Sequence, residues 1–220
     1  MLVLISRFIV IVFCFSSLSA YAKNVEDQHM LTELNEKQSS PKLKQHAIAK
    51  GKERALLCSQ CHGNDGNSVK PDIPNLASQN PTYLFEQIKK FADGSRKNYV
   101  MNALSKDFSS EDQVNLAIFY ASMEVKQLKT DARLATIGQS LYASKCSLCH
   151  GEQGLGKADF ARIAGQNPQY VELTLRRFRQ NTQVTLANKS KRRSFIMEGV
   201  TKTLSDEDIK TLAAYVGQMH

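Results

Sequence analysis

The sequence of 220 residues has no tryptophan, only five prolines and only five cysteines. It also has no segment in which apolar and polar residues alternate over the length of a half-buried strand, which excludes a sheet-based fold. Its apolar run Phe8–Phe15 is much shorter than the roughly 20 residues of a membrane span. The lack of alternating segments favours an all-α chain, and the shortness of the apolar run argues against a membrane anchor at this position.

The first 22 residues have the three parts of a secretory signal peptide. Arg7 supplies a positive charge, Phe8–Phe15 a short apolar core, and Ala20–Ala22 a small-x-small cleavage site. A membrane anchor is the alternative, and the short apolar run disfavours it. We therefore predict export and cleavage after Ala22, which also removes Cys14.

The four remaining cysteines all lie in two copies of one pattern, Cys-x-x-Cys-His, at Cys58–His62 and Cys146–His150. Thiols at this spacing lie on one helical turn, where each reaches a vinyl group on the same porphyrin edge. The histidine that follows can then supply the proximal nitrogen to the iron. A lone Cys-x-x-Cys also occurs in redox dithiols and zinc sites, but a histidine after both copies disfavours these.

The pattern therefore predicts two covalently bound haem c groups. The predicted thioether cysteines are Cys58, Cys61, Cys146 and Cys149, and the predicted proximal ligands are His62 and His150. No thiol remains for a disulfide. Each half has about 80 residues, a size at which a protein core alone gives marginal stability. A covalently held macrocycle would form the centre of each core and fill the volume that tryptophan often takes.

The two halves align closely, which indicates a tandem repeat. Residues 70–81 match 157–168 at an offset of 87, and Met101 matches Met197 at an offset of 96. Nine additional residues therefore lie between Phe178 and Arg192. We predict a polar lead-in at 23–44 in an extended or frayed form, a first domain at 45–124, a linker at 125–134 and a second domain at 135–220.

Each repeat is predicted to be helical. The first helices are expected at 47–57 and 136–145, directly before the Cys-x-x-Cys-His motifs. The middle helices begin at Pro81 and Pro168, because proline suits a first helical turn. The last helices begin after Ser109 and Ser205, since serine caps a helix and the acidic residues that follow favour the positive end of its dipole.

A six-coordinate haem iron needs a second axial ligand, and a methionine thioether raises the reduction potential relative to a second histidine. Two methionine pairs repeat at the same offset, Met101 with Met197 and Met123 with Met219. The second pair falls at the end of the last helix. The first pair lies in a predicted loop that could reach the far face of the ring, so we predict Met101 and Met197 as the axial ligands. A methionine packed on the core is the alternative.

The proximal histidine usually donates its other ring N–H to an acceptor that fixes the ring. A backbone carbonyl near Pro74 is the predicted acceptor in the first repeat, and Ala161 stands in that place in the second. Alanine keeps the carbonyl but loses the fixed φ of proline. We therefore expect the two haems to differ in reduction potential.

The two motifs, the run Pro74-x-Leu-Ala-x-Gln-Asn-Pro81 and the methionine before a capped last helix resemble dihaem cytochrome c of the cytochrome c4 type, over about residues 45–220. The resemblance implies a tandem repeat of two class I cytochrome c domains, with haem propionate edges facing each other. It implies a glycine on the first helix against an aromatic on the last, here Gly51 with Phe119 and Gly138 with Tyr215. Ala161 and the nine-residue insertion depart from the family pattern.

The resemblance further implies a periplasmic electron carrier that serves terminal oxidases and is often associated with the membrane. Its partners would be redox proteins, such as membrane respiratory complexes, and not nucleic acid. Two alternatives remain. One is a dihaem enzyme, such as a peroxidase or a thiosulfate-oxidising cytochrome, which needs an open or labile iron. The other is a haem subunit of a larger dehydrogenase, as in a flavocytochrome.

The net charge of +8 is unevenly distributed. Residues 23–130 carry a net charge of +2, and residues 131–220 carry +5. The region from Arg176 to Arg193 has seven basic residues and no acid. It is either a solvated face or a docking surface for an acidic partner or anionic lipid headgroups.

Overall fold

The structure, a computed structural model, describes residues 25–181 and 193–219. Within these residues it contains helices and no strand, and one isolated bridge pairs Lys157 with Phe160. The all-α prediction is confirmed. The signal peptide with its cleavage site after Ala22, and residues 182–192 of the basic region, lie outside the described residues. In the described ranges, no helix has both the length and the apolar character needed to cross a membrane.

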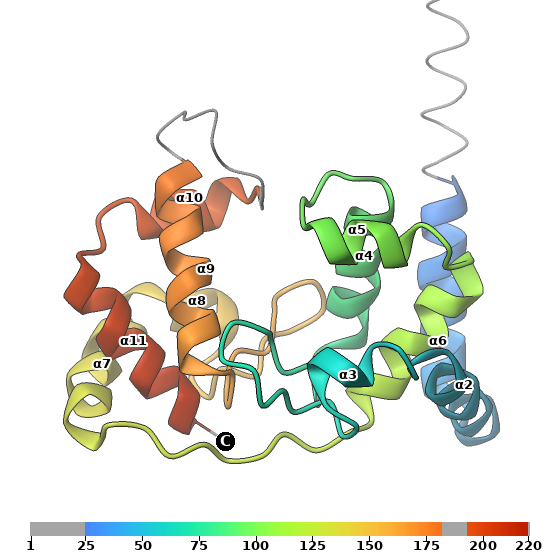
Figure 1. The fold of residues 1–220 in the computed structure, drawn as a ribbon, viewed down its shortest axis with the longest axis horizontal. Helices are drawn as coiled ribbons and strands as arrows, with labels where there is room; N and C mark the ends of the chain where they lie inside the picture. Colours follow the sequence, from blue (N-terminus) through green and yellow to red (C-terminus); the bar gives the residue numbers. More distant parts are fainter. Residues whose placement is uncertain (1–24, 182–192, 220) are drawn as a thin grey trace, which may run out of the picture.

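The helices form two sets in the same order along the chain, which Figure 1 shows side by side and joined by a linker below them. The first set is α2 (Pro41–Arg54), α3 (Ser59–His62), α4 (Pro81–Ala92), α5 (Tyr99–Ser105) and α6 (Ser110–Ala121). The second set is α7 (Ala132–Lys145), α8 (Ser147–His150), α9 (Pro168–Asn181), α10 (Phe195–Thr201) and α11 (Asp206–Gln218). We call these sets the first and second modules.

In each module the first and last helices pack against each other, α2 on α6 and α7 on α11. They meet at a glycine. A Cβ at Gly51 would lie 2.5 Å from the Cβ of Phe119, and one at Gly138 would lie 3.0 Å from the Cβ of Tyr215. Any side chain at these glycines would push the helices apart, so the glycine–aromatic pairs implied by the resemblance are present.

The predicted helix starts are confirmed where capping chemistry defines them. Ser109 and Asp112 form a capping box at α6, and Ser205 and Asp208 form the matching one at α11. The first helices begin earlier than predicted. Ser40 caps α2 and Asp131 caps α7, and these caps lie several residues before the predicted starts at 47 and 136.

The prediction of an extended lead-in is wrong. Residues 25–39 form a helix that precedes α2 (blue in Figure 1). Its Leu34 is fully buried and Met30 nearly so, and both belong to the core cluster that contains Val114 and Phe85. The segment is polar overall, but Met30, Leu34 and the partly buried Leu31 are enough to dock the helix by one face.

This extra helix explains a difference between the modules. At the positions of Val114 and Phe85, the second module has Lys210 and Glu172. Lys210 is exposed. The first module therefore has an apolar face that the segment 25–39 covers, whereas the second module has charged groups at the equivalent positions.

Candidate haem sites

A continuous cavity of about 470 Å³ lies between the helices and is lined by residues of both modules. Every predicted site residue lines it: Cys58, Cys61, His62, Met101, Cys146, Cys149, His150 and Met197. Met123 and Met219 are absent from its lining. Their side chains lie instead near the backbones of Gly66 and Gly154.

Each Cys-x-x-Cys-His motif forms one helical turn. The amide of His62 donates to the carbonyl of Cys58 over 2.9 Å, and the amide of His150 donates to that of Cys146 over 3.0 Å. This turn brings both cysteines and the histidine of each motif to the cavity. The local geometry is the one that attachment of a single macrocycle through two thioethers requires.

Both histidines donate Nδ1–H to a backbone carbonyl. The acceptor of His62 is Pro74 O at 2.9 Å, and that of His150 is Ala161 O at 2.8 Å. The predicted acceptors are therefore present in both modules. This bond leaves Nε2 as the nitrogen available to a metal. Burial lowers the pKa of His62, which favours the neutral imidazole that binds metals.

Met101 and Met197 were predicted to lie in loops. They lie instead in the short helices α5 and α10. The side chains of Asn98 and Ser194 cap these helices by accepting hydrogen bonds from the amides of Met101 and Met197, over 3.0 and 3.3 Å. A capping residue three positions before each methionine was the signal that the loop prediction overlooked.

One thiol of each motif has a raised pKa. Burial raises the pKa of Cys58, and it raises that of Cys146 to about 11. Reactive dithiol cysteines need a depressed pKa instead. In the part of the chain that the structure describes, no group of three or more histidine, cysteine or acidic side chains is placed to hold a metal ion.

A further cavity residue fits a haem group. Arg162 lines the cavity, and its Nε is buried without a hydrogen-bond partner. Burial also lowers the pKa of this guanidinium. A buried N–H donor without an acceptor is costly. Haem propionates are anionic acceptors, so the cysteine, histidine, methionine and arginine side chains together suit haem c. The sequence patterns did not identify Arg162.

The two modules are joined across the cavity by matching hydrogen bonds. Gln166 bonds both backbone groups of Asn75, and Gln79 bonds both backbone groups of Arg162. Asn80 Nδ2 donates to the carbonyls of Leu155 and Phe160, and Asn167 Nδ2 donates to that of Lys70. The two glutamines thus make reciprocal contacts with equivalent residues, whereas the two asparagines bond to residues that are not equivalent in the repeat.

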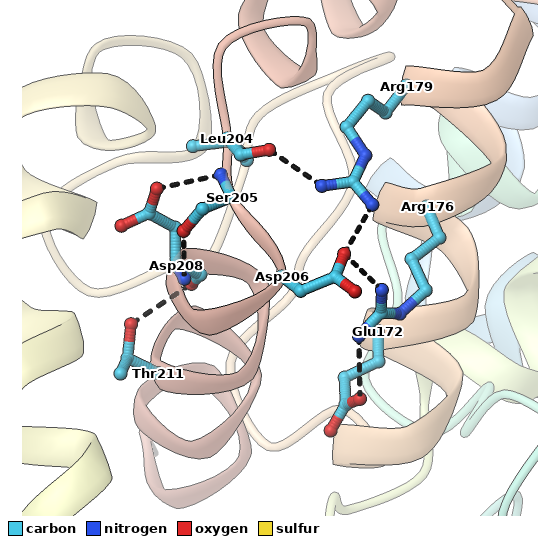
Figure 2. Close-up of polar contacts among 8 residues, drawn as sticks. All are labelled: Glu172, Arg176, Arg179, Leu204, Ser205, Asp206, Asp208 and Thr211. Carbon is cyan, nitrogen blue, oxygen red and sulfur yellow. Dashed lines mark hydrogen bonds and ion pairs between the residues drawn. The ribbon is translucent and has the colours of Figure 1, made fainter.

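Several arginines of the basic region have acidic partners within the chain. Figure 2 shows Arg176 and Arg179 of α9 both paired with Asp206, in the first turn of α11. Arg176 also lies 4.0 Å from Glu172, and Arg193 pairs with Glu198 at 3.0 Å. The pairs with Asp206 tie α9 to α11, so part of the charge of this region serves the fold.

Comparison with known proteins identifies the family of this chain. The family model described as Cytochrome c matches residues 135–220. The cytochrome c4 of Pseudomonas aeruginosa is 31% identical over 182 residues, which cover 78% of this chain and 88% of that protein. This chain belongs to the cytochrome c4 family. The crystal structure of reduced recombinant cytochrome c4 from Pseudomonas stutzeri superposes with a TM-score of 0.68 at 29% identity, covering 77% of this chain and 97% of that one.

A further relative has a name that refers to a redox partner. The thiosulfate dehydrogenase electron acceptor of Stutzerimonas stutzeri is 28% identical, over 74% of this chain and 81% of that protein. For the present chain, membership of the cytochrome c4 family establishes two class I cytochrome c domains and covalently bound haem c. The two Cys-x-x-Cys-His motifs account for two such groups.

Proposed function

We propose that this protein is a periplasmic electron carrier that passes single electrons between respiratory donors and a terminal oxidase or reductase, and that it is not itself an enzyme. The two haem groups would supply one-electron Fe(III)/Fe(II) chemistry. Cys58 and Cys61 would hold the first haem, haem 1, and His62 and Met101 would be the protein ligands of its iron. Cys146 and Cys149 would hold haem 2, and His150 and Met197 would be the ligands of its iron.

The observation that carries this proposal is that a histidine and a methionine of each module line the same cavity. Two protein ligands per iron leave no open position for oxygen or peroxide, which disfavours a dihaem enzyme. Because the cavity is continuous between the modules, the chain is suited to hold two redox centres close together. We take 45–124 and 125–134 as the first domain and the linker, and 135–220 as the second domain.

Intact mass and redox titration of the exported protein test this function. We expect the mass to exceed that of the mature polypeptide by two haem groups, and the N-terminal residue to be Lys23. Reduction should take place in two one-electron steps, with a red-region absorption band from Met–Fe(III) bonding at both irons. Peroxidase turnover, or carbon monoxide binding to the reduced native protein, would favour an enzyme instead.

Redox proteins are the proposed partners, among them membrane respiratory complexes, and peripheral membrane association is part of the proposal. The name of the Stutzerimonas stutzeri relative favours a second candidate, in which the donor is a thiosulfate dehydrogenase. In that case thiosulfate plus a thiosulfate dehydrogenase reduces this protein, and thiosulfate alone does not. Reduction by thiosulfate alone would make the chain an enzyme. Co-purification of a second chain would establish a dehydrogenase subunit.

A further inference from the structure

Two buried glutamines connect each module to the proximal histidine of the other. In the first module, the peptide group between Pro74 and Asn75 has partners on both sides. Its carbonyl accepts from Nδ1–H of His62 over 2.9 Å, and its N–H donates to Oε1 of Gln166 over 2.8 Å. The C=O and N–H of a trans peptide point in opposite directions. One amide therefore links a histidine of the first module to a glutamine of the second.

The second module has the mirror arrangement. The carbonyl of Ala161 accepts from Nδ1–H of His150 over 2.8 Å. The N–H of the same peptide group, which belongs to Arg162, donates to Oε1 of Gln79 over 2.7 Å. The chain thus contains two equivalent relays, each of which crosses the boundary between the modules.

The hydrogen-bond partners fix the orientation of both glutamine side chains. Gln166 Oε1 also accepts from the amide of Asn167, while its Nε2 donates to the carbonyl of Asn75. Gln79 makes the corresponding bonds with Asn80 and Arg162. Both glutamines are more than nine-tenths buried. In such surroundings water does not replace a lost hydrogen bond, and each bond is electrostatically stronger than in water.

We propose that Gln166 lowers the reduction potential of haem 1 and that Gln79 lowers that of haem 2. Each acts as a positioning residue through the proximal histidine of the opposite module. Hydrogen bonds in a chain polarise one another, so an acceptor on the peptide N–H strengthens the peptide carbonyl as an acceptor for the histidine. A stronger acceptor makes the imidazole a more electron-rich ligand, which stabilises the oxidised iron.

This inference rests on the proposed ligation of the irons by His62 and His150. The test uses the full haem-loaded protein and its Gln166→Leu variant. A redox titration followed by NMR of the hyperfine-shifted haem resonances gives a separate potential for each haem. We expect the variant to raise the potential of haem 1 and to move that of haem 2 by less. The Nδ1–H resonance of His62 should shift as well, and that of His150 should move less.

Two further variants serve as matched controls. Gln79→Leu should reverse the pattern and raise the reduction potential of haem 2 more than that of haem 1. Asn167→Ala removes the 3.3 Å bond from Asn167 to the carbonyl of Lys70, which also joins the modules but involves no histidine-bound peptide. We expect Asn167→Ala to leave both reduction potentials unchanged. If Gln166→Leu does not assemble, Gln166→Glu retains an acceptor oxygen, and haem 1 should then stay at or below its native potential.

The outcomes separate this inference from the proposed function. Equal shifts of both haems in Gln166→Leu, or the same shift in Asn167→Ala, would mean that loosening of the interface moves the potentials, and the relay would be rejected. A rise of haem 1 in Gln166→Glu as large as in Gln166→Leu would reject it too. Failure of the proposed function appears in the unmodified protein, as a missing haem or a missing Met–Fe(III) band.

Discussion

At the scale of single residues, each module has two methionines in different surroundings. Met101 and Met197 line the cavity. Met123 and Met219 lie against glycine backbones: a Cβ at Gly66 would come within 2.9 Å of the Met123 sulfur, and one at Gly154 within 3.1 Å of the Met219 methyl group. The second pair therefore has a packing role, which methionine fills well because its side chain is flexible.

This difference gives a prediction for the optical spectrum. We expect Met101→Ala to remove about half of the red-region Met–Fe(III) band, because one of two irons loses its sulfur ligand, and to lower the potential of haem 1. Met123→Ala should keep the whole band. The measurement is the absorption spectrum of the oxidised protein during spectroelectrochemistry. Loss of band intensity in Met123→Ala alone would reverse the assignment.

Sequence patterns identified the residues whose chemistry depends on short spacing. The Cys-x-x-Cys-His turn is local, and alignment of the repeats led to the carbonyls of Pro74 and Ala161. Arg162, Gln79 and Gln166 were not identified, because their partners lie in the other module, 83 and 91 residues away for the two glutamines. No local pattern encodes such a contact.

At the scale of helices, the segment 25–39 is the clearest addition to the repeat. It lies on the first module through Leu34, which has no exposed surface. An ion pair between Asp27 and Lys89 of 2.7 Å and one between Lys37 and Glu111 of 3.5 Å fix it to α4 and α6. Composition alone pointed to a frayed segment, since its apolar stripe is short and consists of Met30, Leu31 and Leu34.

We expect Leu34→Ala to destabilise the first module by about 3 kcal/mol, since truncating a buried leucine leaves a cavity. The control is Leu43→Ala on α2, where the side chain is 44% exposed and the expected cost is under about 0.5 kcal/mol. Denaturant unfolding, followed by the absorption of haem 1, measures both. Equal stability of the two variants would show that the segment does not contribute to the core.

The contact between α9 and α11 predicts a pH dependence. Hydrogen bonds from Arg179 and Arg176 hold the pKa of Asp206 below its usual value. A carboxyl group with a lowered pKa stabilises the folded state above its unfolded pKa of about 3.9, and this contribution is lost as the pH falls through the folded pKa. We therefore expect Asp206→Asn to be less stable than the native protein at neutral pH, with a difference that narrows in acid.

Urea midpoints at neutral and strongly acidic pH measure this difference. Glu207→Gln is the control, because it removes the same charge from the next position of α11, whereas Arg176 and Arg179 pair with Asp206. If the difference in urea midpoint between Asp206→Asn and the native protein does not change with pH, the ion pairs do not stabilise the fold.

At the scale of the whole molecule, the second half carries most of the positive charge, with a net charge of +5 against +2 for residues 23–130. Because Arg176 and Arg179 are engaged with Asp206, we expect the docking role predicted for the run Arg176–Arg193 to fall on its other basic residues, which include Lys189, Lys191 and Arg192 outside the described residues. Charges of this kind steer a partner of opposite sign and are screened by salt.

We expect added salt to slow the reduction of an acidic partner steeply, and neutralisation of Lys189, Lys191 and Arg192 to remove most of that dependence. Arg176→Gln is the matched control: it should weaken the α9–α11 contact and leave the salt dependence in place. Stopped-flow rates over a range of ionic strength measure both effects. A rate insensitive to salt would identify the basic region as a solvated face.

The contact between the modules has one more consequence. Its glutamine bonds occur once in each repeat, since each repeat supplies both a glutamine and the peptide group that the other glutamine binds. In this respect the face is self-complementary, as in isologous dimers with two-fold symmetry. Two copies of one ancestral module could therefore have formed this pair of bonds as separate chains, and the covalent linker now holds the two halves close enough to form them.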